Sequence, residues 1–297
     1  EIPVLSCGGM RYQQSWDDMD AHSIDSTGQE NVEAVIHQAL EYGINHIETA
    51  RGYGTSEMQL GWVLPKIDRD RLLIQTKIHP FGEDGKSLRK IFETSMSYLN
   101  LEYVDFLSIH GINHPHHLEQ CLQKGGAMDE VRVLQREGRV RFVGYSTHGG
   151  PEVAIPAAAS GEFDYVNLHW YFVYHPMNWS MVKASNEADM GVFIISPNDK
   201  GGMLYQPSSI MKKHCGPITP MQWHDCYCLQ RPEVHTLSLG AAKPSDFKEH
   251  VDAVCGNIAD DAINAITAAL ETELRDRPGN LWMDNWYKGI PHHTEIP

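Results

Sequence analysis

Short apolar runs alternate with amphipathic segments along most of the chain. The apolar runs are rich in Val, Ile, Leu and aromatic residues and end at polar residues or glycine, a pattern typical of strands in a buried parallel sheet. They predict eight β-strands, at residues 3–9, 44–50, 72–78, 104–110, 140–146, 165–171, 191–196 and 234–240.

Helical periodicity fills most of the intervals between these runs. In the first interval, apolar residues recur at helical spacing from Val32 to Leu40, a capping box over residues 27–30 predicts the start of a helix, and Gly43 predicts its end. The same signals predict further helices, at about residues 56–64, 88–99, 128–138, 219–229, 245–254 and 260–277. The irregular stretch at 198–217, which follows the seventh strand, is predicted to be an active-site loop or lid.

A (β/α)8 barrel consists of eight repeats of a strand followed by a helix. We therefore predict a single α/β domain over residues 1–297, a (β/α)8 TIM barrel with a C-terminal helix and tail at about 256–297. No linker marks a second domain.

Composition and charge narrow the class of protein. A net charge of −15 argues against nucleic acid or an anionic membrane surface as a partner. No apolar run approaches the roughly 20 residues of a membrane span, and no signal peptide opens the sequence. The six cysteines are scattered without a CxxC pair, as in a reduced protein. These features predict a cytoplasmic protein with a small-molecule partner, and they leave the oligomeric state open.

Candidate catalytic residues lie where the predicted strands end. Glu48, Lys77 and His110 come at the ends of the second, third and fourth strands, and Tyr53 lies in the loop after the second strand, between two glycines. Because the C-terminal ends of barrel strands meet at one face, we expect these four side chains to form one site.

These residue types suit carbonyl reduction. The ordinary pKa of tyrosine, about 10, is too high for ready proton release at neutral pH, and a nearby ammonium lowers it. Lys77 would therefore lower the pKa of Tyr53, and Glu48 would keep Lys77 charged and in place. His110 would hydrogen-bond the substrate oxygen or relay the proton, and Tyr53 would protonate the alkoxide as a hydride arrives from a cofactor.

Over nearly its whole length the sequence resembles the aldo-keto reductase superfamily. That family carries Asp-Thr-Ala and then Tyr-Gly after the second strand, Lys after the third and His after the fourth. Here these positions read Glu48-Thr49-Ala50, Tyr53-Gly54, Lys77 and His110. The run from Ser6 to Arg11 is most similar to the branch that elsewhere carries an iron-sulfur domain, but the cluster cysteines are not present, so we predict no cluster.

The resemblance implies NADPH as cofactor, with NADH possible, and a small carbonyl substrate. It implies nicotinamide contacts from Ser146, Thr147 and Asn167, and pyrophosphate contacts from Ser196 and Pro197. The adenosine end is expected at a helix N-terminus, which favours anions. The residues implied there are Gly240, Ala241, Ala242, Lys243, Ser245 and Asp246.

The chain departs from the family pattern at several positions. Glu48 replaces Asp, Asn167 replaces Gln, and Thr147 replaces Asn. The arginine that often binds the 2′-phosphate after the eighth strand is missing, and only Lys243 and Lys248 are nearby cations. The preference between NADPH and NADH therefore stays open.

Two other functions fit parts of the sequence. The histidines from His110 to His117 suggest the metal site of a barrel hydrolase, although such enzymes usually place two histidines on the first strand, where this chain has none. An exposed polar loop explains the same histidines without a metal, and we predict no metal ligands. The other alternative is a barrel that binds the cofactor without turnover, as a sensor or subunit.

Overall fold

The strands close into a parallel barrel in a computed structural model of the chain. The structure describes residues 1–80, 87–200, 202–276, 286 and 288. Each strand pairs with the next along the chain, and β1 pairs with β8. The predicted (β/α)8 barrel is confirmed. Its strands are β1 (Leu5–Gly8), β2 (His46–Glu48), β3 (Leu73–Ile78), β4 (Val104–Ile109), β5 (Val140–Thr147), β6 (Tyr165–Leu168), β7 (Gly191–Ile195) and β8 (Thr236–Gly240).

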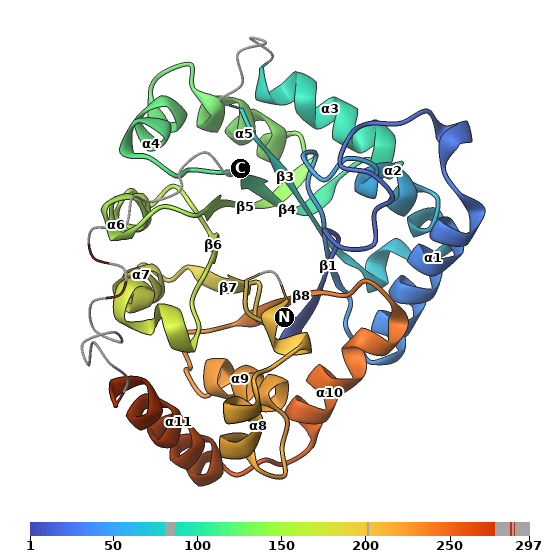
Figure 1. Ribbon diagram of the computed structural model, residues 1–297. Coiled ribbons are helices and arrows are strands. Elements are labelled where there is room, and N and C mark those ends of the chain that lie inside the picture. The colour runs from blue at the N-terminus through green and yellow to red at the C-terminus, as the bar shows by residue number, and fades with distance from the viewer. Residues whose placement is uncertain (81–86, 201, 277–285, 287, 289–297) are drawn as a thin grey trace.

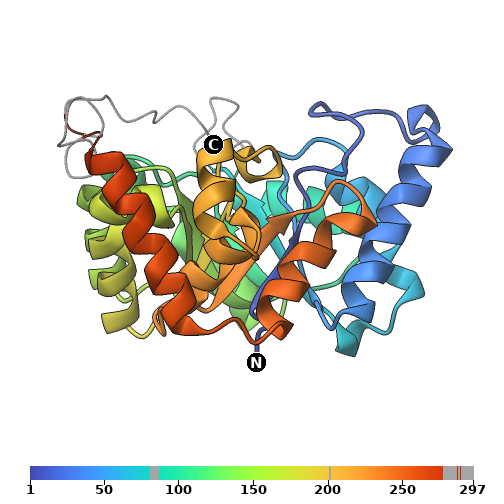
Figure 2. The same cartoon turned by 60° about the horizontal axis from the view of Figure 1, so that its bottom comes forward.

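Helices surround the strands, as Figure 1 shows. Figure 2 places the N-terminus below the barrel, at the end where β1 begins. The C-terminal helix α11 packs on α8 and α9. The helices are α1 (Ser26–Glu41), α2 (Ser56–Gly61), α3 (Leu88–Leu99), α4 (Pro115–Leu122), α5 (Ala127–Arg136), α6 (Pro151–Ala159), α7 (His175–Glu187), α8 (Ser209–Cys215), α9 (Pro220–Leu229), α10 (Phe247–Cys255) and α11 (Asp260–Arg275).

The barrel interior changes from apolar to polar along the strands. At the end where the strands begin, Phe106, Tyr165 and Phe193 pack together, and the rings of Tyr165 and Phe193 stack with centroids 4.9 Å apart. Two residues further along β4 and β6, Ser108 and Asn167 face the same interior, because strand side chains alternate with period two. The polar side chains are therefore delivered toward the end where the strands finish.

Several predicted boundaries were wrong for local reasons. Helix α1 begins at Ser26, and Asp25 caps it by accepting from the Gly28 amide, so the predicted capping box at 27–30 does not form. Strand β6 ends at Leu168 rather than 171, before the 3-10 turn Phe172–Tyr174. The predicted irregular stretch contains α8, capped by Ser208. The tail expected beyond residue 277 lies outside the described residues, apart from Trp286 and Lys288.

No explicit helix was predicted at the positions of α4, α6 and α7. Each of these helices carries proline in its first turn, and α6 also contains Pro156. Proline suits the first turn of a helix, but it weakens a helical pattern in the sequence. No helix among the described residues is long and apolar enough to cross a membrane.

Candidate active site

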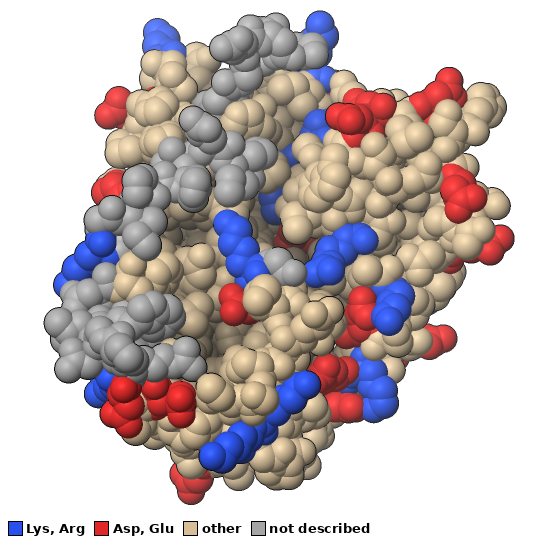
Figure 3. Space-filling view, in the orientation of Figure 1, with Lys and Arg blue, Asp and Glu red and all other residues tan. Residues whose placement is uncertain are grey.

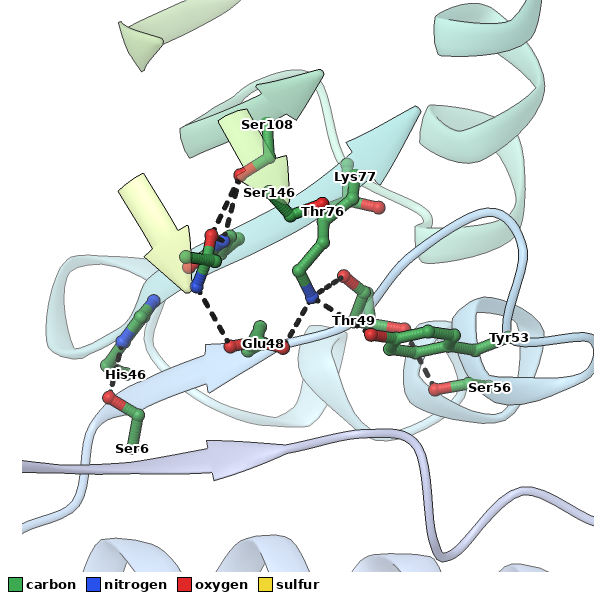
Figure 4. Close-up of polar contacts among 12 residues, drawn as sticks. Ser6, His46, Glu48, Thr49, Tyr53, Ser56, Thr76, Lys77, Ser108 and Ser146 are labelled. Carbon is green, nitrogen blue, oxygen red and sulfur yellow. Dashed lines mark hydrogen bonds and ion pairs between the residues drawn. The ribbon is translucent and has the colours of Figure 1, made fainter. Parts of the chain in front are cut away.

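A buried ion pair between Glu48 and Lys77 forms the centre of the site. Glu48 is the last residue of β2 and Lys77 lies near the end of β3, and the two side chains are in close contact (Figure 4). Burial raises the pKa of the Glu48 carboxyl, but the charge and hydrogen bond of Lys77 and the Ser238 hydroxyl together outweigh burial, so the pKa lies below the ordinary value. Burial lowers the pKa of the Lys77 ammonium, but Glu48 and Tyr53 together outweigh burial, so the pKa of Lys77 lies above its ordinary value. Both groups are therefore charged at neutral pH.

Tyr53 lies against this ion pair. Its hydroxyl is 3.3 Å from Lys77 Nζ, which also donates to the Thr49 carbonyl at 3.3 Å. Figure 4 shows Lys77 between Glu48 and Tyr53. The structure thus brings together the acid, the ammonium and the phenol that the sequence placed at successive strand ends.

Burial, and not Lys77, decides the acidity of Tyr53. Burial raises the pKa of the phenol more than the neighbouring ammonium lowers it, so the pKa lies above its ordinary value. Lys77 does lower the pKa of Tyr53, as predicted, but burial reverses the net direction. A phenol that stays protonated is suited to donate a proton rather than to accept one.

The loop that carries Tyr53 is fixed at both ends. Gly54 has φ of +51°, and a Cβ there would lie 2.0 Å from the Ser15 carbonyl, so only glycine fits. A second contact comes from α2, where the Glu57 carboxylate accepts hydrogen bonds from Thr76 of β3 at 2.6 Å and from Arg51 at 2.9 Å. These contacts tie the loop to the strand that bears Lys77.

His110 completes the predicted group. Its ring meets the Tyr53 ring edge to face, with centroids 5.8 Å apart. Burial, and then the Lys77 charge, hold the pKa of His110 well below its ordinary value. The imidazole is therefore neutral at pH 7, and it can hydrogen-bond an uncharged substrate oxygen.

These four residues line a cavity of about 500 Å³ at the face where the strands end. Ligand sites of small molecules commonly have this size. Trp16, which is 60% exposed, and Met10 give it apolar surface, and the Trp16 ring meets Tyr53 edge to face at 6.3 Å. The polar lining adds Ser146, His148, His169, Ser196, Asn198 and Ser238.

The structure separates the residues predicted to bind the cofactor into two groups. Ser146, Ser196 and Gly240 line the cavity. Thr147 does not, because its hydroxyl donates to the Ile112 carbonyl and accepts from the Gly149 amide. Asn167 is fully buried beneath the cavity among other side chains. The Pro197 carbonyl accepts from the His224 ring.

The remaining predicted residues lie in the segment that joins β8 to α10. Ala241, Ala242, Lys243 and Ser245 do not line the cavity. The Asp246 carboxylate accepts from the amides of Ala242, at 2.9 Å, and Lys243, at 3.3 Å. In the structure these amides are paired within the segment, and a role of this segment in binding stays a prediction.

Two cations at the cavity were missed from the sequence. Arg11 follows β1, and its guanidinium lies 5.5 Å from the centre of the Tyr205 ring; Lys200 lies in the segment after β7. Neither side chain forms an ion pair with another described residue. Figure 3 shows Lys and Arg atoms on both sides of a hollow near the middle of this face. The only sequence signal for them was their position a few residues after a strand end, and the strand pattern does not show where such segments lead.

The histidine segment offers no metal site in the described part of the chain. At the start of α4 the rings of His114 and His116 stack, and the His117 ring meets both edge to face, with centroids 4.4–5.1 Å apart. Among the described residues, no group of three or more His, Cys, Asp or Glu side chains could hold a metal ion. The hydrolase alternative therefore gains no support.

Comparison with known proteins agrees with this geometry. The model of the aldo/keto reductase family matches residues 4–164. A probable aldo-keto reductase 1 of Glycine max is 24% identical, over 88% of this chain and 84% of its own length. An NADH-specific methylglyoxal reductase of Escherichia coli K12 is 22% identical, over 83% and 84%.

Solved structures share the fold. An aldo-keto reductase of Bacillus halodurans in its holo form matches with a TM-score of 0.73 and 18% identity, over 90% of this chain and 92% of that one. One from Klebsiella pneumoniae, in complex with NADPH, matches with a TM-score of 0.71 and 15% identity, over 90% and 91%.

Proposed function

Since the chain belongs to the aldo/keto reductase family, we propose that it is an NAD(P)H-dependent oxidoreductase that reduces aldehydes or ketones to alcohols. The observation that carries this proposal is the Tyr53 hydroxyl, 3.3 Å from Lys77 Nζ in the wall of the cavity. The substrate is a small carbonyl compound, and the protein acts in the cytoplasm. Residues 1–297 act as one barrel domain.

The cavity fits a nicotinamide cofactor, which supplies a hydride when bound. Arg11 and Lys200 carry positive charge without a carboxylate partner among the described residues, and so they suit the phosphates of a dinucleotide. Ser146 and Ser196 offer hydroxyls in the same wall. Related proteins include one named as NADH-specific and one solved with NADPH, so both cofactors are candidates.

The side chains of this chain handle the proton. In the proposed role Tyr53 donates its hydroxyl proton to the carbonyl oxygen as that oxygen gains negative charge, and solvent later restores the proton. The Lys77 ammonium stabilises the resulting phenolate, and Glu48 balances the charge of Lys77. Neutral His110 orients the carbonyl oxygen by a hydrogen bond.

Titration with NADPH and with NADH, followed by quenching of Trp fluorescence, tests the cofactor. Trp16 lines the cavity and reports on its occupancy. We expect saturable binding, and an increase in Kd of about 3- to 10-fold in each of Arg11→Gln and Lys200→Gln. Lys66→Gln, whose ammonium pairs with Glu33 at 2.6 Å, is the control that leaves Kd unchanged. Absence of binding to both nucleotides would contradict the proposal.

A further inference from the structure

The Asn167 amide contacts the Glu48 carboxylate from across the barrel. We propose that Asn167 is a positioning residue, which holds the Glu48 carboxylate and through it Lys77 and Tyr53. This inference rests on the proposed function for its catalytic meaning. The nicotinamide contact that the resemblance implies for Asn167 stays a separate prediction.

The amide of Asn167 has a fixed orientation. Its Oδ1 accepts from Gln75 Nε2 at 2.7 Å and from Ser108 Oγ at 3.0 Å. Because both neighbours deliver hydrogens to the oxygen, the amide nitrogen must point the other way, and its Nδ2 lies 3.5 Å from Glu48 Oε2. The side chain is fully buried and does not line the cavity.

Asn167 therefore contacts one oxygen of the Glu48 carboxylate while Lys77 contacts the other, and the Ser238 hydroxyl also bonds this carboxylate. Lys77 contacts Glu48 Oε1, and Asn167 donates to Glu48 Oε2 from β6. A carboxylate held at both oxygens cannot rotate without losing one of these contacts. The Lys77 ammonium hydrogen-bonds both the Glu48 carboxylate and the Tyr53 hydroxyl. The orientation of the carboxylate therefore sets the position of the ammonium relative to the phenol.

The two residues also depart from the family pattern in opposite senses. Glu48 is one methylene longer than the usual Asp, and Asn167 is one methylene shorter than the usual Gln. The structure places these two departures in contact, so the combined reach from β2 and β6 is kept. The reciprocal exchange should restore that reach, whereas each single exchange should leave a gap or a clash.

The test compares four proteins: the natural chain, Glu48→Asp, Asn167→Gln, and the double variant. For each, kcat, KM, the Kd of NADPH and NADH, and the urea unfolding curve are measured. We expect kcat to fall about 10- to 100-fold in each single variant, the value of one hydrogen bond to a charged group, with Kd changed less than about 3-fold. In the double variant kcat should return to within about 5-fold of the natural value, and unfolding should show the same non-additivity.

Two outcomes overturn the proposal. A raised cofactor Kd with unchanged kcat in Asn167→Gln would make Asn167 a cofactor contact, and losses that simply add in the double variant would remove the coupling. Thr236→Val is the matched control: it removes the buried hydrogen bond to Ser6 in the same barrel, at 2.7 Å, and should lower stability without changing kcat. Asn167→Ser replaces Asn167→Gln if the latter does not fold.

Failure of the proposed function is distinguishable from failure of this inference. If the natural chain shows no turnover with any carbonyl compound, the proposed function is rejected. The unfolding curves alone then test the contact between Asn167 and Glu48. Non-additive changes in the unfolding free energy would support the coupling between Glu48 and Asn167, and additive changes would contradict it.

Discussion

At the scale of single residues, the acidity of Tyr53 is set by two opposing effects. Burial favours the neutral phenol, while Lys77 favours the phenolate. Burial wins in the structure, so Tyr53 is protonated at neutral pH and is ready to act as an acid. The ammonium contributes when the phenolate forms, because it then faces a full negative charge at hydrogen-bonding distance.

Lys77→Met should be both inactive and unstable. The variant leaves the Glu48 carboxylate buried without its cation, and removing one partner of a buried ion pair costs about 3–5 kcal/mol of unfolding free energy. Urea denaturation measures this loss. The double variant Lys77→Met/Glu48→Gln should recover part of the stability and none of the activity. A Lys77→Met protein as stable as the natural chain would show that the pair is not charged.

At the scale of elements, the loop between β2 and α2 presents Tyr53 to the cavity. It is held by Gly54, which touches the segment after β1, and by Glu57, which reaches β3. The periodicity of the strands predicts neither contact, because both join residues that are distant in sequence.

Gly54→Ala should displace the phenol. The new Cβ would lie 2.0 Å from the Ser15 carbonyl, so the loop must move, and kcat should fall at least about 10-fold. Gly43→Ala is the matched control, since Gly43 also has positive φ, +78°, but open space around it. Gly43→Ala should lose about 1 kcal/mol of stability from backbone strain, and Gly54→Ala should lose more because of the added clash. Equal kcat values in the two variants would argue that the loop does not position Tyr53.

The strand ends could be predicted from sequence because apolar runs and polar termini repeat through the barrel. Glu48, Lys77 and His110 were found in this way, and the loop glycines marked Tyr53. Helix α8 was missed because the irregular composition around it hid its short pattern. The contact of Asn167 with Glu48 was missed because it depends on side-chain lengths across the barrel axis, and Arg11 and Lys200 lie in segments whose paths no periodicity encodes.

At the scale of the whole molecule, buried neutral histidines link stability to pH. Burial lowers the pKa of His46 to about 4 and holds the pKa values of His110 and His169 well below the ordinary value. Between those values and about 6.5, the unfolded chain binds protons that the folded chain does not. His250 acts in the opposite sense: burial lowers its pKa, but Asp225, with smaller contributions from Glu249 and Asp246, raises the pKa above its ordinary value.

Stability should therefore fall as the pH drops from about 7 toward 4. His46 alone, with its pKa lowered from 6.5 to about 4, accounts for roughly 3 kcal/mol of that change. Urea unfolding at several pH values measures the slope, and His46→Gln should flatten it. A stability that is constant or rising toward pH 4 would contradict this view of the interior.

The most direct test of the central claim is the transfer of deuterium from the reduced cofactor to a carbonyl substrate. NADPH and NADH deuterated at nicotinamide C4, in each stereochemical form, are incubated with the protein and a panel of aldehydes and ketones, and the alcohols are analysed by mass spectrometry. We predict carbon-bound deuterium in the product of the natural chain. We predict almost none with Tyr53→Phe, which still binds the cofactor. Undiminished transfer by Tyr53→Phe, or no transfer by a natural chain that binds the cofactor, would contradict the account.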